Sequence, residues 1–216
     1  MISLSNLRQF KTDGRKFSCL TCYDASMAKA MEIAQIDTIL IGDSLGMAIQ
    51  GRDSTLAVTV DDMAYHTAAV RRGNQHAFIM TDLPFMSYAT LNDALISAKT
   101  VMQAGAQMIK IEGGAWLSES VEVLTRNGIP VCVHLGLTPQ SVHVLGGYKL
   151  QARTREAADR LIADCQAVVD AGAALLLLEC VPAQLGREIS QLFPQIPVIG
   201  IGAGVDTDGQ VLVVQA

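Results

Sequence analysis

The feature that most constrains the fold is a repeated unit: a short apolar run, then one or two polar residues, then a helical pattern. Nearly all of the runs are continuously apolar, which is typical of strands buried on both faces of a parallel sheet. Eight runs of this kind are predicted as strands: Ser18–Tyr23, Thr38–Ile41, Ala77–Thr81, Gln107–Ile111, Pro130–Val133, Ala174–Leu178, Pro197–Ile201 and Gln210–Val214.

The segments between these runs carry apolar residues at helical spacing and recognisable helix ends. Thr59 and Asp62 form a capping-box pattern, and Gly73 is a plausible residue just beyond the end of the same helix. The predicted helices are Ala25–Gln35, 59–73, 90–104, Ser118–Asn127, Thr154–Asp170 and Ala183–Phe193. Strands therefore alternate with helices along most of the chain.

Alternating strand–helix units form right-handed crossovers, and eight of them favour a (β/α)8 barrel. The prediction is a single barrel domain over residues 1–216. An open, doubly wound sheet is the alternative, although no GxGxxG motif follows the first strand. Ala216 comes shortly after the eighth strand, so the last helix of the barrel is expected to be missing.

Composition excludes several classes of protein. Half of the residues are hydrophobic, 17% are charged and the net charge is −5, which argues against nucleic acid or an anionic membrane as a partner. No apolar run reaches the roughly 18–20 residues of a membrane helix, and the first residues lack the pattern of a secretory signal. The expected location is the cytoplasm, with the five cysteines reduced.

Cys19 and Cys22 have the CxxC spacing of redox and zinc motifs. They lie within a predicted strand rather than at the start of a helix. We therefore expect neither a redox nor a zinc function for this pair.

Ionisable residues stand at the carboxyl ends of the first six predicted strands. In a (β/α)8 barrel these ends meet on the face that carries the active site. Asp24 is expected to be only a helix N-cap. The candidate site residues are Asp43, Ser44, Asp82, Lys110, Glu112, His134 and Glu179.

Three of these candidates, Asp43, Asp82 and Glu112, suggest a hard cation that prefers oxygen ligands. Mg²⁺ fits this set, with two carboxylates as direct ligands and a third acting through water. Zinc is disfavoured, because only His134 is placed to contribute a nitrogen ligand. The sequence thus predicts a magnesium site that leaves positions for a chelating substrate.

Lys110 and Glu179 suggest two further functions. Lys110 could bind a substrate carboxylate, and a salt bridge to Glu112 is compatible with that role. Glu179 follows four leucines, and a carboxyl group in apolar surroundings holds its proton more tightly than in water, which suits a general base. The long irregular segment Gly136–Ala152 is a candidate lid.

Several long motifs, in order from about Leu7 to the end of the chain, resemble the ketopantoate hydroxymethyltransferase family. They are TCYDASMAKAM, ILIGDSLGMAIQGRDSTLAVTVDDMAYHTAAVRRG, TDLPFMSY, IKIEGG, HLGLTPQSVHVLGGYK, LLLLECVP and IGIGAGVDTDGQVLV. Their number and length make this resemblance far more specific than one short pattern.

The resemblance implies a barrel of the phosphoenolpyruvate/pyruvate superfamily that uses Mg²⁺. It implies transfer of a hydroxymethyl group from 5,10-methylenetetrahydrofolate to 3-methyl-2-oxobutanoate. The product would be 2-dehydropantoate, made through a Mg²⁺-stabilised enolate on the route to pantothenate and coenzyme A. It also implies a homodecamer of two stacked pentamers. Family members continue past the eighth strand, where this chain ends.

The resemblance also implies roles for individual residues. Asp43 and Asp82 would ligate the metal, with Glu112 in its water shell. Ser44, Lys110 and His134 would hold the keto acid together with the metal ligands. Glu179 would accept the proton.

Two other functions remain open from the sequence. A Mg²⁺-dependent C–C lyase acting on 2-oxo acids would share the metal site but would not depend on folate. A catalytically idle barrel in an assembly would show no turnover.

Overall fold

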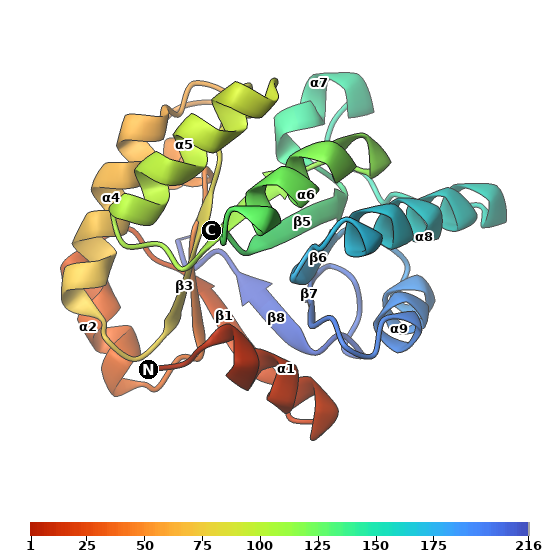
Figure 1. The fold of residues 1–216 in the computed structure, drawn as a ribbon, viewed down its shortest axis with the longest axis horizontal. Helices are drawn as coiled ribbons and strands as arrows, with labels where there is room; N and C mark the ends of the chain where they lie inside the picture. Colours follow the sequence, from red (N-terminus) through yellow and green to blue (C-terminus); the bar gives the residue numbers. More distant parts are fainter. Residues whose placement is uncertain (216) are drawn as a thin grey trace.

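The computed structural model describes residues 1–215, and Ala216, the last residue of the predicted domain, lies outside them. Eight parallel strands close into a barrel in sequence order, with β8 paired to β1 (Figure 1). The strands are β1 (Phe17–Thr21), β2 (Thr38–Ile41), β3 (Phe78–Asp82), β4 (Met108–Glu112), β5 (Val131–Gly136), β6 (Leu175–Glu179), β7 (Val198–Ile201) and β8 (Gly209–Leu212). The predicted barrel is confirmed, and the open doubly wound sheet is wrong.

Helices surround the barrel and connect consecutive strands (Figure 1). The longer ones are α1 (Leu4–Thr12), α2 (Ala25–Ile33), α4 (Val60–Gly73), α5 (Leu91–Gln103), α6 (Ser118–Arg126), α8 (Arg155–Asp170) and α9 (Ala183–Leu192). The short ones are α3 (Leu45–Ala48), η1 (Ala115–Leu117), η2 (Pro139–Ser141) and α7 (Val142–Leu145). Within residues 1–215, no helix is long and apolar enough to span a bilayer.

Side-chain caps are present at four of the predicted helix starts, those of α2, α4, α5 and α8, whereas α6 and α9 begin without one. Asp24 accepts a hydrogen bond from the Met27 backbone N–H at 2.8 Å, so it is the N-cap that the sequence indicated. Thr59 and Asp62 form the predicted capping box at the start of α4. These caps satisfy backbone donors that the first turn leaves without partners.

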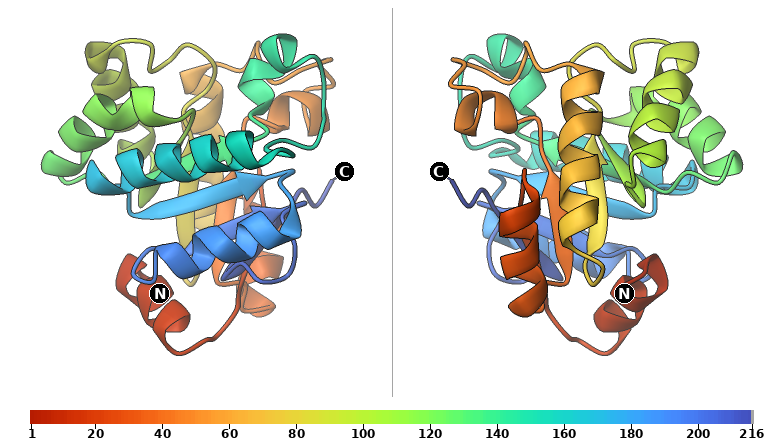
Figure 2. Two further views of the ribbon diagram at one scale, coloured as in Figure 1. Left: turned by 90° about the vertical axis from the view of Figure 1, so that its right-hand side faces the viewer. Right: turned by 90° about the vertical axis from the view of Figure 1, so that its left-hand side faces the viewer.

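The helix α1 was not among the predicted elements, and it lies across the end of the barrel away from the strands' carboxyl ends. Figure 2 places this helix, in red, at the opposite end of the molecule from α7, in teal. Leu7 of α1 is fully buried in the inner core. The Lys11 ammonium bonds to the backbone oxygens of Ser190 and Ile196 and to Asp208, at 2.8–2.9 Å. These contacts close the end of the barrel at which the strands begin.

The apolar residues form two cores, one inside the barrel and one between the strands and the helices. The alternation of side chains along each strand assigns neighbouring residues to different cores. Cys19 belongs to the inner core and Cys22 to the outer one. The two cysteines are buried free thiols that pack in different cores.

The same alternation places the charged residues inside the barrel mouth. In β3, Phe78 and Met80 belong to the inner core, so Asp82 points inward two residues later. In β4, Met108 leads in the same way to Lys110 and Glu112. Strand register then sets Asp82 beside Lys110 and Glu112 beside His134. Acidic and basic side chains thus replace apolar ones in the upper layer of the barrel.

Candidate active site

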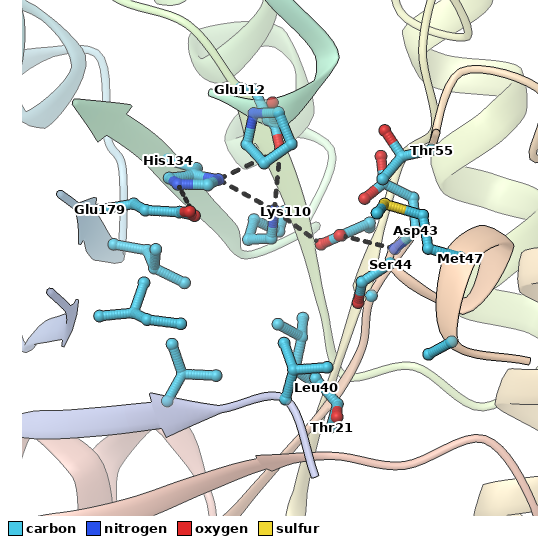
Figure 3. Close-up of a pocket in the computed structure, with 18 of the residues that line it drawn as sticks. Thr21, Leu40, Asp43, Ser44, Met47, Thr55, Lys110, Glu112, His134 and Glu179 are labelled. Carbon is cyan, nitrogen blue, oxygen red and sulfur yellow. Dashed lines mark hydrogen bonds and ion pairs between the residues drawn. The ribbon is translucent and has the colours of Figure 1, made fainter. Parts of the chain in front are cut away.

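A cavity of about 430 Å³ opens at the carboxyl ends of the strands (Figure 3). Its volume is within the range of small-molecule sites. All the candidate residues from the sequence line it: Asp43, Ser44, Asp82, Lys110, Glu112, His134 and Glu179. Figure 3 shows Asp43 and Ser44 on one side of Lys110, and His134 and Glu179 on the other.

Lys110 is the central cation of the cavity and is only 3% exposed. Its ammonium lies 3.0 Å from Asp82 Oδ1 and 3.5 Å from Glu112 Oε1. Burial opposes the charge, but the carboxylates of Asp82, Glu112 and Asp43 outweigh it and raise the pKa of Lys110 well above its usual value. The predicted contact with Glu112 is therefore present, together with a closer one to Asp82.

His134 links two carboxylates through its two ring nitrogens. Nδ1 lies 3.2 Å from Glu112 Oε1, and Nε2 lies 3.2 Å from Glu179 Oε2. Burial and the Lys110 charge oppose protonation, but Glu112 and Glu179 outweigh them and raise the pKa of His134 to about 9. The imidazole is thus cationic at neutral pH. Its 3.3 Å approach to the Lys110 ammonium is then a contact between two donors that share Glu112.

Glu179 differs from the other carboxylates because its side chain retains 17% exposure. Leu177 and Ile201 line the cavity on the same side, so the apolar surroundings predicted from the sequence are present. They are incomplete, because His134 contacts the carboxylate. That contact is an ion pair whose alignment falls short of a hydrogen bond, since no atom in residues 1–215 bonds to His134 Nε2.

The carboxylates on the Asp43 side are held close together. The Asp43 backbone N–H donates to Asp82 Oδ2 at 3.0 Å. Burial, followed by the charges of Asp82 and Glu112, raises the pKa of Asp43 well above its usual value. Burial also raises the pKa of Asp82 despite the Lys110 charge beside it. By contrast, Lys110 and His134 outweigh burial and lower the pKa of Glu112 to about 2.

The charge of this cavity fits a divalent cation. With all four carboxylates ionised, Lys110 and His134 leave two negative charges uncompensated. Asp82 Oδ1 is a buried oxygen that pairs with the Lys110 ammonium at 3.0 Å, and no donor in the described residues forms an aligned hydrogen bond to it. A hard cation is the partner that such oxygens favour.

No group of three or more His, Cys, Asp and Glu side chains within residues 1–215 is arranged to hold a metal ion. Lys110 lies between Asp82 and Glu112, and this separates the three predicted ligands. Asp43 and Asp82 are the two candidate ligands that still lie close together, since the Asp43 backbone N–H bonds to the Asp82 carboxylate.

Ser44 follows the end of β2, and its hydroxyl group is held by a hydrogen bond to a buried tyrosine. Its Oγ is 2.7 Å from the Tyr23 hydroxyl, and Tyr23 is almost fully buried. The ring of Tyr23 is packed edge-on against His66. The Ser44 side chain is thus oriented by residues from two other elements.

The predicted loop Gly136–Ala152 is less irregular than expected, because it contains η2 and α7. Both of its ends are attached to the end of β6. The Leu137 N–H donates to Glu179 O, and the Gln151 N–H donates to Cys180 O, each at 2.8 Å. The base of the loop is therefore fixed to the segment that carries Glu179.

Gly136 is required at the start of this loop. Its φ is +90°, and a Cβ there would lie 2.4 Å from Glu179 O. We expect Gly136→Ala to lower the melting temperature more than Gly128→Ala does. Gly128 also has positive φ, but a Cβ there meets no atom within 4 Å. The Gly128 variant pays only the conformational cost of about 1–2 kcal/mol, or a few degrees for a chain of this size.

Differential scanning calorimetry of the two alanine variants measures the clash separately from the conformational cost. Equal shifts would show that the end of β6 moves away from the added methyl group without strain.

Sequence reasoning missed two buried residues at this site, Gln140 and Tyr88. The Gln140 side chain donates to Asp43 Oδ2 at 2.8 Å. Its backbone N–H donates to Glu112 Oε2 at 3.0 Å. Gln140 lies in the short helix η2 and Tyr88 in the segment between β3 and α5. Neither side chain carries a charge, so the only sequence signal was their position within the long motifs.

Comparison with known proteins gives one consistent family. A family model described as ketopantoate hydroxymethyltransferase matches residues 1–216. A 3-methyl-2-oxobutanoate hydroxymethyltransferase of Acinetobacter baumannii (strain AYE) is 88% identical over 215 residues, covering 100% of this chain and 80% of that protein. The enzyme of that name from Psychrobacter sp. (strain PRwf-1) is 64% identical, covering 99% of this chain and 78% of its own length.

Solved structures of similar fold are more distant in sequence. Phosphonopyruvate hydrolase in complex with oxalate and Mg²⁺ has a TM-score of 0.74 at 13% identity, covering 99% of this chain and 81% of that one. A 2,3-dimethylmalate lyase, described as a member of the PEP mutase/isocitrate lyase superfamily, has a TM-score of 0.71 at 15% identity, covering 100% and 82%. These likenesses show that the chain shares the barrel fold of those proteins.

Proposed function

The chain belongs to the ketopantoate hydroxymethyltransferase family, and we propose that it converts 3-methyl-2-oxobutanoate to 2-dehydropantoate with 5,10-methylenetetrahydrofolate as the one-carbon donor. The observation that carries this proposal is the division of the cavity. Carboxylates suited to a cation lie on one side of Lys110, and a partly exposed carboxylate suited to proton transfer lies on the other. Such a division separates charge stabilisation from proton abstraction.

Asp43 and Asp82 would hold Mg²⁺, with Glu112 acting through water. When bound, Mg²⁺ supplies Lewis-acid stabilisation of the negative charge that develops on the keto oxygen of the substrate. The pKa of Asp43, which burial and the neighbouring carboxylates raise, supports this assignment, as does the burial of the Asp82 carboxylate beside it. A divalent cation would remove the charge repulsion that the protein alone leaves between these groups.

Lys110, His134 and Ser44 would bind the keto acid. Both Lys110 and His134 are cationic and line the cavity, so they can pair with the substrate carboxylate. Ser44 can donate its hydroxyl proton to a substrate oxygen while Tyr23 holds its Oγ. Three donors placed around the substrate would fix its orientation relative to Glu179.

Glu179 would remove the proton from C3 of the bound keto acid. The electron pair of the broken C3–H bond moves into the enolate, and the proton is held on the Glu179 carboxyl group. The His134 cation contacts this carboxylate and orients it. C3 of the enolate then forms a bond to the methylene carbon of the folate, and water supplies the hydroxyl oxygen. Both C–N bonds to that carbon break, and tetrahydrofolate leaves with the proton held on Glu179 and a proton from water on its two nitrogens.

The segment Gly136–Ala152 would act as the lid over this reaction. Its attachment to Glu179 O and Cys180 O leaves the part that contains α7 as the section able to move. Val144 and Tyr148 are exposed apolar side chains on this section. Closing them over the cavity would exclude water from the enolate.

The same proposal covers location and assembly. The enzyme would act in the cytoplasm, on the route to pantothenate and coenzyme A, as a homodecamer of two stacked pentamers. Exposed apolar side chains such as Ile33, Tyr65 and Trp116 support contacts with further copies of the chain.

The proposal is tested by NMR of 3-methyl-2-oxobutanoate in deuterated water with the purified protein. The C3 proton signal is expected to disappear only when Mg²⁺ is present, because enolisation exchanges that proton for deuterium from the solvent. Adding 5,10-methylenetetrahydrofolate should then yield 2-dehydropantoate.

Three other outcomes would contradict parts of the proposal. Exchange without transfer would remove the folate step. Cleavage of a 2-oxo acid without folate would favour a lyase. No exchange with folded, metal-loaded protein would favour a catalytically idle barrel.

A further inference from the structure

Gln140 is a buried residue that contacts two of the acidic residues lining the cavity, Asp43 and Glu112. It lies in η2, at the base of the proposed lid, and is 6% exposed. Its side chain reaches Asp43 on the β2 side, and its backbone N–H reaches Glu112 on the β4 side. One residue therefore contacts two of the three proposed metal carboxylates.

Every polar atom of the Gln140 side chain is used, and this fixes the orientation of the amide. Nε2 donates to Asp43 Oδ2 at 2.8 Å and to Leu83 O at 3.0 Å. Oε1 accepts from the Tyr88 hydroxyl at 2.5 Å. A flipped amide would place Gln140 Oε1 next to the Asp43 carboxylate oxygen and the Leu83 carbonyl oxygen. These three atoms are all acceptors, so no hydrogen bond could form between them.

Tyr88 extends this arrangement back to Glu112. It is 6% exposed, and its hydroxyl accepts from the Glu112 backbone N–H at 3.2 Å while donating to Gln140. Asp43 and Glu112 are thus joined by a closed set of hydrogen bonds through Gln140 and Tyr88. Hydrogen bonds connected in this way polarise and support one another in a buried site.

The donors in this network are neutral, and this distinguishes them from Lys110. A lysine or arginine beside Asp43 would compensate its charge and compete with a metal ion. An amide orients the carboxylate and leaves its charge uncompensated. Partners of this kind behind metal ligands typically change metal affinity by 10–100-fold when they are removed.

We propose that Gln140, braced by Tyr88, is a positioning residue that holds the Asp43 and Glu112 carboxylates in the orientation that receives the divalent cation. The inference rests on the metal site of the proposed function and adds two residues to it. It also links the metal to the base of the lid, because Gln140 belongs to that segment.

Isothermal titration calorimetry of the metal-free protein with Mn²⁺ alone tests this inference, and the measurement involves no turnover. Gln140→Met retains the length of the side chain and removes its hydrogen bonds. We expect its Mn²⁺ dissociation constant to rise by about 10-fold or more. Tyr88→Phe removes only the hydrogen bonds of the Tyr88 hydroxyl, and we expect a smaller rise in the Mn²⁺ dissociation constant.

Two control variants separate positioning from a general loss of structure. The Ser97 hydroxyl donates to Ser87 O at 2.7 Å and anchors the loop that carries Tyr88, without touching the network. Ser97→Ala should lower the melting temperature of the metal-free protein and leave Mn²⁺ binding unchanged. Glu122→Gln changes an exposed side chain on α6 and should change neither quantity.

The outcomes are distinguishable. Suppose that the wild-type protein binds Mn²⁺ and that Gln140→Met and Tyr88→Phe bind it with the same dissociation constant. This result would overturn the inference and leave the proposed metal site intact. Weaker binding in Ser97→Ala, to the same degree as in Gln140→Met, would show a structural effect and would also overturn it. No binding by the wild-type protein would contradict the proposed metal site and this inference together.

Discussion

Glu179→Gln is expected to lower the rate of C3 proton exchange by about 10²–10⁴-fold, the usual contribution of a general base. The amide has the shape of the carboxylate and cannot accept the proton. Exchange of the C3 proton for deuterium, followed by NMR in the presence of Mg²⁺, measures the step directly. Binding of the keto acid should survive, since Lys110, His134 and Ser44 are unchanged.

A matched variant is Glu122→Gln, which changes an exposed carboxylate on α6 in the same way. It should exchange at the wild-type rate. If Glu179→Gln also exchanged at that rate, another group would be the base. A loss of keto acid binding in Glu179→Gln would instead assign this residue to substrate recognition.

The second large effect is expected for Asp43→Asn, with opposite signs for metal binding and for stability. Removing the charge should abolish measurable Mn²⁺ binding, because Asp43 is one of two direct ligands in the proposed site. The metal-free protein should become more stable. Folding raises the pKa of Asp43, so its ionised form destabilises the folded state at any pH above the usual aspartate value of about 4.

The sign of the pH dependence follows from that shift. The stabilisation by Asp43→Asn should be larger at pH 7 than at pH 5, because less of the wild-type penalty is present at the lower pH. Urea unfolding at both pH values measures this difference in the free energy of unfolding. In a thermal melt, each kcal/mol would correspond to about 2–4 °C in melting temperature. Asp53→Asn, an exposed residue in the following loop, is the control. A stability gain that is independent of pH would contradict the argument.

The sequence predicted the barrel because its strands are buried on both faces and therefore carry a strong local signal. It predicted the site because residues at strand ends converge wherever parallel strands close into a barrel. Asp82, Lys110 and Glu179 could be found in this way without any knowledge of their neighbours. Their roles stay predictions until the experiments above are made.

The features that the sequence did not predict depend on contacts between distant segments. The position of Lys110 between Asp82 and Glu112 follows from strand register, which no local pattern specifies. Gln140 and Tyr88 lie 52 residues apart in the sequence, and neither residue type indicates a site by itself. The helix α1 was missed although Leu4, Leu7 and Phe10 have helical spacing and Ser3 is a good N-cap.

The two ends of the lid segment are fixed next to each other on β6, at Glu179 O and Cys180 O. This arrangement makes residues 138–150 a module with defined attachment points. A replacement segment of different length would leave the strand register of the barrel undisturbed, since loop closure depends only weakly on length. Gln140 is the one position in the module with a side chain bonded to Asp43. Exchanging the outer part while keeping this glutamine would therefore vary access to the cavity independently of the chemistry inside it.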